Sequence, residues 1–319
     1  MFLLDSALVM ISKNKILILG LFVSTSFSQE VKWMSIGDLH NWYSAAGCEV
    51  ETGRTGQVSD QQDGLRYPAF YRVQDNQAAK GLWLGATNFY DPVVNKDYEY
   101  KVIHAGPRHL DIENETMPVD MTMDGKYDHP NVFVDGDPAT NLQYLDDVDN
   151  VDPSLPSDRR INNIVQTSIG VQMKRTIHAF SHPEHQNYHI QEYVFTNNGC
   201  FDADCNTSYE QTLEGFQVYL QYRYAISREG MVYDGNWLPQ SAAWGHNTMN
   251  DVIGEHPDAP SINDQFYDNG EIMRALFSWQ GYHSDASFDN LGGPNAPGDG
   301  HLGAAQFVGV VTLHADTSP

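Results

Sequence analysis

The stretch VQTSIGVQMKRTIHAF, residues Val165–Phe180, decides the fold class. Apolar or small side chains alternate with polar ones along most of it. Because successive side chains of a strand point to opposite faces of a sheet, a period of two residues predicts a β-strand with one buried face. We therefore expect one long strand here.

Two further runs alternate in the same way. Tyr188–Thr196 follows the polar stretch 181–187 and ends at the turn-like 197–199, so it is expected to pair with the first run as a long hairpin. Phe216–Ile226 places apolar residues on one face. Shorter strand candidates are Tyr67–Val73, Gly81–Phe89, Tyr98–His104, Asn131–Val134, Ile272–Trp279 and Gln306–His314.

No segment shows a sustained helical period, aromatic residues make up 12% of the chain, and glycine and proline are frequent. These features predict an all-β fold, an antiparallel β-sandwich with long strands and long Asp/Gly/Pro-rich loops. The predicted loops are Asp120–Pro156, Pro257–Asn269 and Asp285–Gly300.

A boundary is expected near Arg160. It would separate an irregular β-rich part, 29–160, from a long-stranded sandwich part, 161–319. Because the chain stops directly after a strand candidate, we expect the second part to be truncated at its C-terminus and the chain to be the N-terminal part of a longer protein.

Residues 1–28 have the organisation of a bacterial signal peptide. Lys13 and Lys15 precede the apolar Ile16–Val23, and small residues lead up to Ser28. The apolar run, even extended to Ser28, is 13 residues long, whereas a helix needs about 20 to span a bilayer. We therefore expect cleavage near Ser28 and no membrane insertion afterwards.

Two details refine the export prediction. Met10 is a better start than Met1, because Asp5 and an apolar patch otherwise come ahead of the basic pair. A lipoprotein needs a cysteine at the cleavage point, and the first cysteine is Cys48. We expect a product that is secreted or held at the outer cell surface by other sequence.

The charge balance excludes some partners. The chain holds 18 Lys and Arg against 42 Asp and Glu, a net charge of −24. Such a surface repels nucleic acid and anionic lipid, so we expect neither as a partner. The acidic excess is explained either by solubility or by bound divalent cations.

The densest acidic region suggests Ca²⁺, which takes six to eight oxygen ligands. With Asp147 as position 1 of a calcium loop, Asp149 is position 3 and Asp158 position 12, but Asp152 stands at position 6, where glycine is expected. The alternative is a solvated acidic loop that caps turns. The predicted ligands are Asp135, Asp137, Asp147, Asp149, Asp152 and Asp158, with Asp146 beside them.

Cysteines and histidines give two more site predictions. Cys200 and Cys205 are close enough in sequence for a disulfide, contributing roughly 2 kcal/mol by loop entropy, and Cys48 has no partner in the chain. The histidines invite a metal interpretation, but a hairpin tip with His178 facing His189 is the alternative. The histidines considered are His104, His178, His182, His185 and His189.

Evidence for catalysis is weak. Glycoside cleavage needs two carboxylates flanking a cleft, and nothing selects a pair from Glu49, Glu51, Asp60 and Asp63. The nucleophile elbow, the His-Glu-x-x-His motif and a phosphate-binding loop are all missing from the sequence. The six tryptophans are either core residues or platforms for sugar rings. They are Trp33, Trp42, Trp83, Trp237, Trp244 and Trp279.

The strand ending NYHIQEYVFTNNG, Asn187–Gly199, resembles the "EY-x-F-x-N-x-G" ending found in large exported β-rich surface proteins of marine and Bacteroidota-type bacteria. Those proteins often carry a type IX secretion sorting domain. Supporting stretches are 106–108, 134–136, 158–160 and 300–305. The resemblance implies a secreted or surface module of unassigned activity.

Together these features predict a secreted or cell-surface β-sandwich module of the non-catalytic type, which serves adhesion, display or binding and holds Ca²⁺ in its acidic loops. The rival prediction is a secreted carbohydrate-active protein that binds or hydrolyses glycans. A cleft with an exposed tryptophan and two carboxylates about 5 to 10 Å apart would favour the rival, and a closed core with buried tryptophans would remove it.

Overall fold

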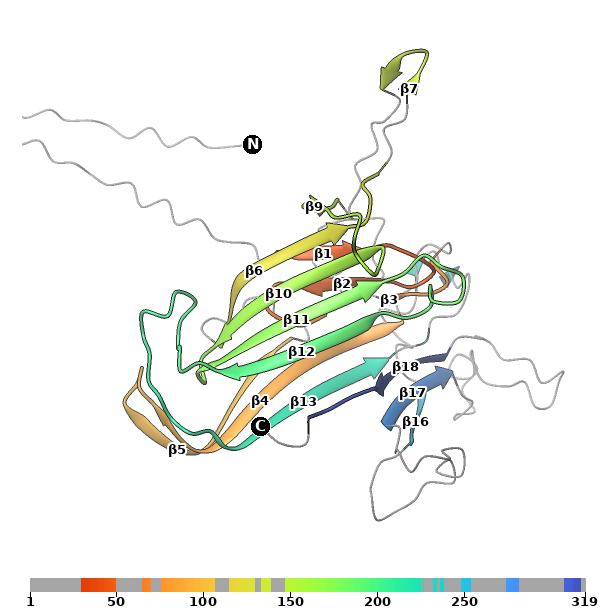
Figure 1. Ribbon diagram of the computed structural model, residues 1–319. Helices are drawn as coiled ribbons and strands as arrows, with labels where there is room; N and C mark the ends of the chain where they lie inside the picture. Colours follow the sequence, from red (N-terminus) through yellow and green to blue (C-terminus); the bar gives the residue numbers. More distant parts are fainter. Residues whose placement is uncertain are drawn as a thin grey trace, which may run out of the picture.

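The computed structural model describes residues 30–49, 65–69, 76–106, 115–129, 133–138, 147–224, 226, 232–233, 236–237, 248–253, 274–280 and 307–316 (Figure 1). These residues form strands, turns and bends, and no helix. None of the described segments is a helix that is long and apolar enough to cross a membrane. The described fold is thus all-β, and its sheets are antiparallel apart from one short parallel contact.

The largest sheet has five strands in the order β12-β11-β10-β6-β9. The parallel contact is between β6 and the two-residue β9. The strands are β6 (Thr116–Gly125), β9 (Asn150–Val151), β10 (Arg159–Thr167), β11 (Val171–Ala179) and β12 (Ile190–Asn197).

The stretch Val165–Phe180 is not the single strand predicted. It contains the end of β10, a turn and β11. Gly170 has φ +75° and donates its N–H to Thr167 O at 3.2 Å, while Thr167 Oγ1 donates to Val171 O at 2.7 Å. The alternation pattern does not reveal this turn, because Ile169 within it is buried and the apolar period of two therefore continues through the change of chain direction.

The prediction for the β11–β12 hairpin is confirmed by antiparallel pairing from Val171↔Asn197 to His178↔Ile190. The predicted loop Asp120–Pro156 is wrong over its first residues, because β6 extends to Gly125 and pairs with β10. The register shifts where Val165 pairs with Pro118, which has no N–H to donate.

A second sheet has the order β13-β4-β5. Its strands are β4 (Gln77–Asp91), β5 (Lys96–Ala105) and β13 (Glu214–Tyr224). The first two extend the predicted strands Gly81–Phe89 and Tyr98–His104, and β13 begins before the predicted Phe216–Ile226 and ends at Tyr224. The turn between β4 and β5 is built by Asp91, whose Oδ1 accepts from the N–H groups of Val93 and Val94. Asn95 completes it with φ +53°, a conformation that asparagine tolerates.

One buried cluster draws on both sheets. Leu84 and Ile103 come from the second sheet, and Val165 and Met173 from the first. Figure 1 shows β12 of the first sheet running alongside β4 of the second. Strand pairing between β6 and β10 and this cluster both join residues from the two sides of the predicted boundary near Arg160.

The remaining strands are shorter. The β1-β2-β3 sheet packs on the largest sheet through a second cluster that includes Met34, Tyr43, Met121 and Ile177. Its strands are β1 (Val31–Met34), β2 (His40–Ser44) and β3 (Leu65–Arg66). A third sheet holds β16 (Thr248–Ile253), β17 (Arg274–Gln280) and β18 (Phe307–Thr312).

The described residues also include two small hairpins: β7 (Phe133–Val134) with β8 (Asp137–Pro138), and β14 (Val232–Tyr233) with β15 (Asn236–Trp237). Of the predicted strand Tyr67–Val73, residues 67–69 form a bend followed by a turn, and the rest lies outside the described residues. The predicted loops Pro257–Asn269 and Asp285–Gly300 also lie outside them.

Candidate functional site

The outer face of the β13-β4-β5 sheet carries a row of aromatic side chains. Leu82, Leu84 and Ala86 of β4 are buried, so the alternation of the strand turns Trp83 outward, where it is 36% exposed. Tyr219 of β13 is its Cα partner on one side and is 61% exposed.

His104 of β5 is the Cα partner of Trp83 on the other side. The rings of Trp83 and His104 stack with centroids 5.1 Å apart and an interplanar angle of 28°. His104 Nδ1 also lies 3.0 Å from Glu115 Oε2, which holds the imidazole in place. We call Tyr219, Trp83 and His104 the aromatic row; it crosses all three strands.

Glycines keep the surface beside the row flat. Gly81 and Gly85 lie two residues to either side of Trp83, and a Cβ on Gly81 would stand 3.1 Å from Trp83 Nε1. Val102, the partner of Gly85, is exposed, as is Tyr100 on the same strand at 69%. Exposed apolar side chains that are contiguous in this way mark interaction surfaces more often than isolated ones do.

A second arrangement, a polar cluster, is closed to solvent. Lys80 of β4 and Glu49 are 1% and 3% exposed and form an ion pair. Lys80 Nζ also donates to Gln191 Oε1 and Tyr193 OH, each at 3.1 Å. Glu49 accepts from Asn41 Nδ2 at 2.7 Å, Gln191 Nε2 at 2.9 Å and Gln77 Nε2 at 3.1 Å.

Glu49 and Lys80 each stabilise the charged form of the other. Burial alone raises the pKa of Glu49, but Lys80 and the amide donors outweigh it and lower that pKa to about 2. Burial likewise acts to lower the pKa of Lys80, and Glu49 raises it well above its usual value. Glu49, a predicted candidate for acid–base catalysis, thus faces a buried cation. Glu51, Asp60 and Asp63 lie outside the described residues.

Three of the six predicted Ca²⁺ ligands have separate protein partners. Asp149 Oδ2 accepts from Met123 N at 2.6 Å and binds Lys32, Asp152 Oδ1 accepts from both the N–H and the hydroxyl of Ser154, and Asp158 Oδ2 accepts from Ser181. Asp135 and Asp137 belong to the β7–β8 hairpin, and Asp147 is exposed. Within the described residues none of the six belongs to a group of three or more side chains placed to share an ion.

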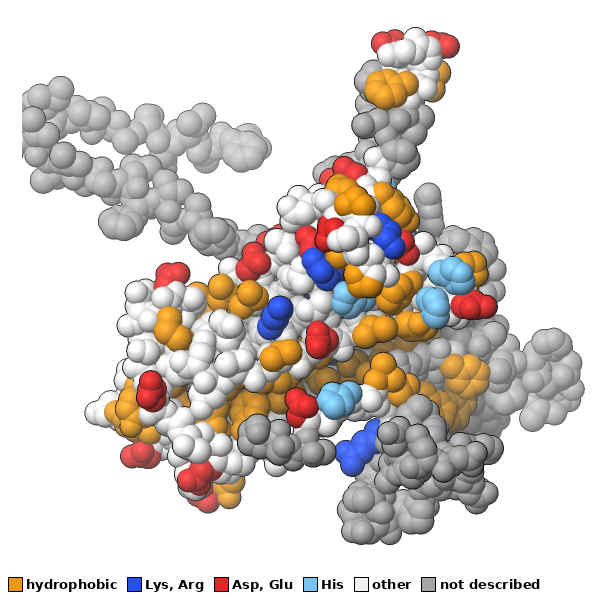
Figure 2. All heavy atoms as spheres, viewed as in Figure 1, with side chains coloured by type: hydrophobic (Ala, Val, Ile, Leu, Met, Phe, Trp, Pro, Cys, Tyr) orange, Lys and Arg blue, Asp and Glu red, His pale blue; other side chains and the backbone are white. Residues whose placement is uncertain are grey.

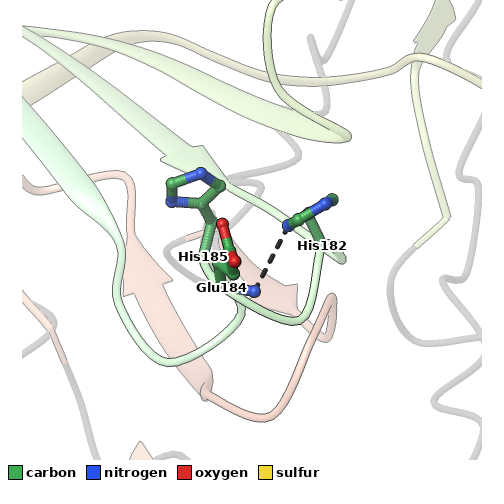
Figure 3. A group of neighbouring side chains, drawn as sticks. All are labelled: His182, Glu184 and His185. Carbon is green, nitrogen blue, oxygen red and sulfur yellow. Dashed lines mark hydrogen bonds between the residues drawn. The ribbon is translucent and has the colours of Figure 1, made fainter.

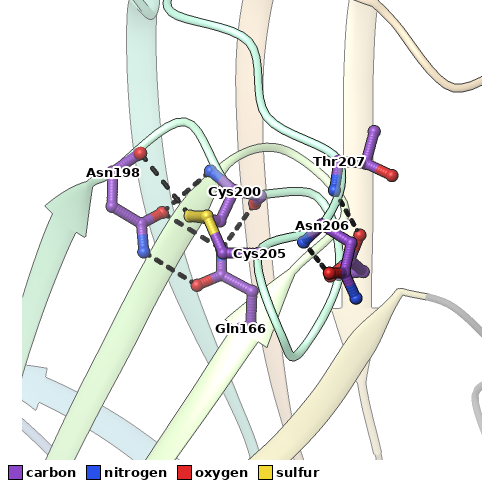
Figure 4. The surroundings of a disulfide bond; sticks show 7 residues. Gln166, Asn198, Cys200, Cys205, Asn206 and Thr207 are labelled. Atoms are coloured by element: carbon purple, nitrogen blue, oxygen red, sulfur yellow. Dashed lines mark hydrogen bonds between the residues drawn. A yellow bond between two sulfur atoms is a disulfide. The ribbon is translucent and has the colours of Figure 1, made fainter.

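Cys200 and Cys205 are joined by a disulfide (Figure 4). The loop is also held by Gln166 Nε2, which donates to Cys200 O at 2.6 Å, and by Asp202, which accepts from the N–H groups of Asn206 and Thr207. Cys48 is buried, and burial raises the pKa of its thiol, which disfavours the reactive thiolate.

The histidines divide into two groups. His178 Nδ1 lies 2.8 Å from Ser157 Oγ, whereas His189 contacts Tyr43 and Leu39, so the expected pairing of His178 with His189 is not formed. His182 and His185 instead come together with Glu184 in the β11–β12 loop (Figure 3). The sequence reasoning missed Glu184, although it lies between the two histidines.

The tryptophans also take different environments. Trp33 and Trp42 are buried and pack against each other. Trp279 is partly buried between Phe277 and Phe307. Trp83 is the exposed one among the tryptophans whose side chains are described; the side chains of Trp237 and Trp244 are outside that set.

Comparisons with known proteins add no assignment: no protein-family model, no curated protein and no solved structure matches this chain. The predicted signal peptide, residues 1–28, and Asp146 lie outside the described residues. A function for this chain is therefore inferred from the geometry of the described side chains and from the sequence.

Proposed function

We propose that this chain is an exported, non-catalytic β-sandwich module that binds a neutral glycan through the aromatic row. The observation that carries the proposal is the alignment of Tyr219, Trp83 and His104 across one exposed sheet face. The module is thus non-catalytic, as in the leading prediction from the sequence, and its ligand is a glycan, as in the rival prediction; it binds the glycan and does not hydrolyse it.

The chemistry of the face suits a sugar ring. The C–H face of a pyranose packs on an aromatic ring, and its hydroxyl groups need hydrogen-bonding partners. Exposed Gln217 and Gln221 stand opposite Gly85 and Gly81, so amides flank the stacking surface on both sides. The net charge of −24 disfavours polyanionic glycans and leaves neutral ones as the preferred class.

Four features support the exported setting and the sandwich. The sequence of residues 1–28 predicts a Sec signal peptide, and a disulfide such as Cys200–Cys205 persists in oxidising compartments outside the cytosol. The resemblance of Asn187–Gly199 to exported surface proteins points the same way. A core that draws on two sheets is what a sandwich requires.

The test is retention of the full chain in native gels containing soluble neutral or uronic-acid polysaccharides, followed by calorimetry on the best ligand. Loss of one stacking ring is worth on the order of 1 kcal/mol or more, so Trp83→Ala should weaken binding at least about fivefold. Phe133→Ala, an exposed aromatic residue on β7, is the matched control and should bind as the unchanged chain does. Equal binding by Trp83→Ala and the unchanged chain would refute the assignment.

The calcium prediction remains separate. Ca²⁺ held by Asp135, Asp137, Asp147, Asp149, Asp152 or Asp158 would make thermal stability depend on the ion, because binding to the folded state alone stabilises it. The melting temperature should then fall on adding a calcium chelator and recover with excess Ca²⁺. An unchanged melting temperature contradicts the prediction.

A further inference from the structure

The tip of the β11–β12 hairpin gathers three metal-ligating side chains. One ligand atom from each of His182, Glu184 and His185 lies within 4.8 Å of the others, and all three residues are exposed. Figure 2 shows histidine and carboxylate side chains together at the end of the sheet, and Figure 3 shows Glu184 between the two imidazoles. We propose that His182, Glu184 and His185 form a Zn²⁺ site, independent of the glycan-binding face.

The donor set selects the class of metal. Imidazole nitrogen with a carboxylate oxygen suits Zn²⁺ and other late first-row cations, whereas Ca²⁺ and Mg²⁺ prefer oxygen alone. Zinc bonds of about 2.0–2.2 Å place two tetrahedral ligands roughly 3.4 Å apart. This spacing lies within the observed limit of 4.8 Å between the ligand atoms, so binding would require the three exposed side chains to rotate toward the ion. Water would supply the fourth ligand.

The backbone below the ligands is fixed before any ion binds. Gln186 O accepts from the N–H groups of Asp38 and Leu39 at 2.9 and 3.1 Å, and Asp158 Oδ2 accepts from Ser181 N at 2.6 Å. A Cβ at Gly37, which has φ +75°, would fall 2.8 Å from Gln186 O, so this close approach requires glycine. A tip anchored at both ends loses little further entropy when it binds an ion.

A neighbouring residue orients one of the imidazoles. The Tyr188 hydroxyl lies 2.5 Å from His185 Nδ1, which leaves Nε2 of that ring for the metal. Histidine ligands are commonly held through their other nitrogen in this manner. His182 Nδ1 accepts from Glu184 N at 3.2 Å. Metal binding through Nδ1 would replace this hydrogen bond directly. Binding through Nε2 would also replace it, because the ring proton would then lie on Nδ1.

The experiment uses the full chain without a polyhistidine tag, stripped with a chelator and titrated with ZnCl₂ in a calorimeter at pH 7.5. One Zn²⁺ per chain is expected, unaffected by excess Ca²⁺. His182→Ala, His185→Ala and Glu184→Gln should each weaken binding at least about tenfold, since even changes at residues that only orient ligands cost 10- to 100-fold. Circular dichroism checks that the variants fold.

His314→Ala is the matched control, because His314 is also exposed and lies 3.1 Å from a carboxylate, that of Asp316. It should bind Zn²⁺ like the unchanged chain, as should Trp83→Ala, which separates this proposal from glycan binding. Absence of Zn²⁺ binding, or equal binding by His185→Ala and the unchanged chain, would overturn the proposal.

Discussion

Lys80 shows how much one buried charge contributes to this fold. Its ammonium group is satisfied by Glu49, Gln191 and Tyr193, which come from a loop and from β12. Breaking a buried pair from one side leaves the other charge without compensation. The loss of stability on removing the Lys80 charge can therefore be measured with a single substitution.

We expect Lys80→Met to destabilise the chain by about 3–5 kcal/mol, because Glu49 remains buried and charged. The double variant Lys80→Met with Glu49→Gln should recover part of that loss. Urea unfolding at pH 7 measures both. Lys174→Met, an exposed lysine on β11, is the control, and a Lys80→Met variant no less stable than this control would contradict the expectation.

His189 predicts how stability depends on pH. Leu39 O can only accept, so His189 Nε2 donates to it at 3.0 Å and Nδ1 accepts from the Tyr43 hydroxyl at 2.8 Å. Burial lowers the pKa of His189 from 6.5 to about 4. Between these values the unfolded chain binds a proton that the folded chain does not, so this contribution to stability is complete above pH 6.5 and is lost as pH falls through about 4.

The measurement is the urea midpoint at pH 7, 5.5 and 4.5. The midpoint should fall with pH in the unchanged chain, and the fall should be smaller in His189→Gln, which does not titrate. His314→Ala, which removes an exposed histidine, should keep the full pH dependence. Parallel curves for His189→Gln and the unchanged chain would rule out this role.

At the level of elements, strand positions were predictable where alternation is strong and less so elsewhere. Phe216–Ile226 and Gly81–Phe89 became β13 and β4 because their apolar faces are regular. The β6 strand escaped prediction because Pro118, Asp120 and Asp124 have low strand propensity, and pairing with β10 overrides it. Sequence spacing also left the aromatic row unseen, since a row across three strands depends on register.

The turn between β10 and β11 gives the prediction at this scale. Gly170→Ala should cost about 1–2 kcal/mol, because an L-residue is strained at φ +75°. The added Cβ would also meet Phe201 Cζ at 3.2 Å. Gly85→Ala, whose Cβ would make only ordinary contacts of 3.5 Å, is the control. Chemical denaturation that fails to separate the two variants would argue against a required left-handed turn.

At the scale of the whole molecule, the two large sheets share their buried surface. The predicted division at Arg160 followed a change in the regularity of the sequence, but regularity reports local alternation and not which cores are joined. Leu84 from the earlier part and Met173 from the later part belong to one cluster. The sheets should therefore unfold together.

Leu84→Ala tests this cooperativity, because it removes a side chain of β4 that is 1% exposed. Core truncations of this kind cost about 2–5 kcal/mol. If the cluster unfolds as one unit, backbone amide hydrogen exchange should accelerate in 159–179 by the same factor as in β4 and β13. This result would be informative because β4, which carries the substitution, does not pair with β10 or β11. Val94→Ala, in the exposed turn before β5, should leave both regions protected. Acceleration confined to β4, β5 and β13 would show that the two sheets open independently and that the division near Arg160 has energetic meaning.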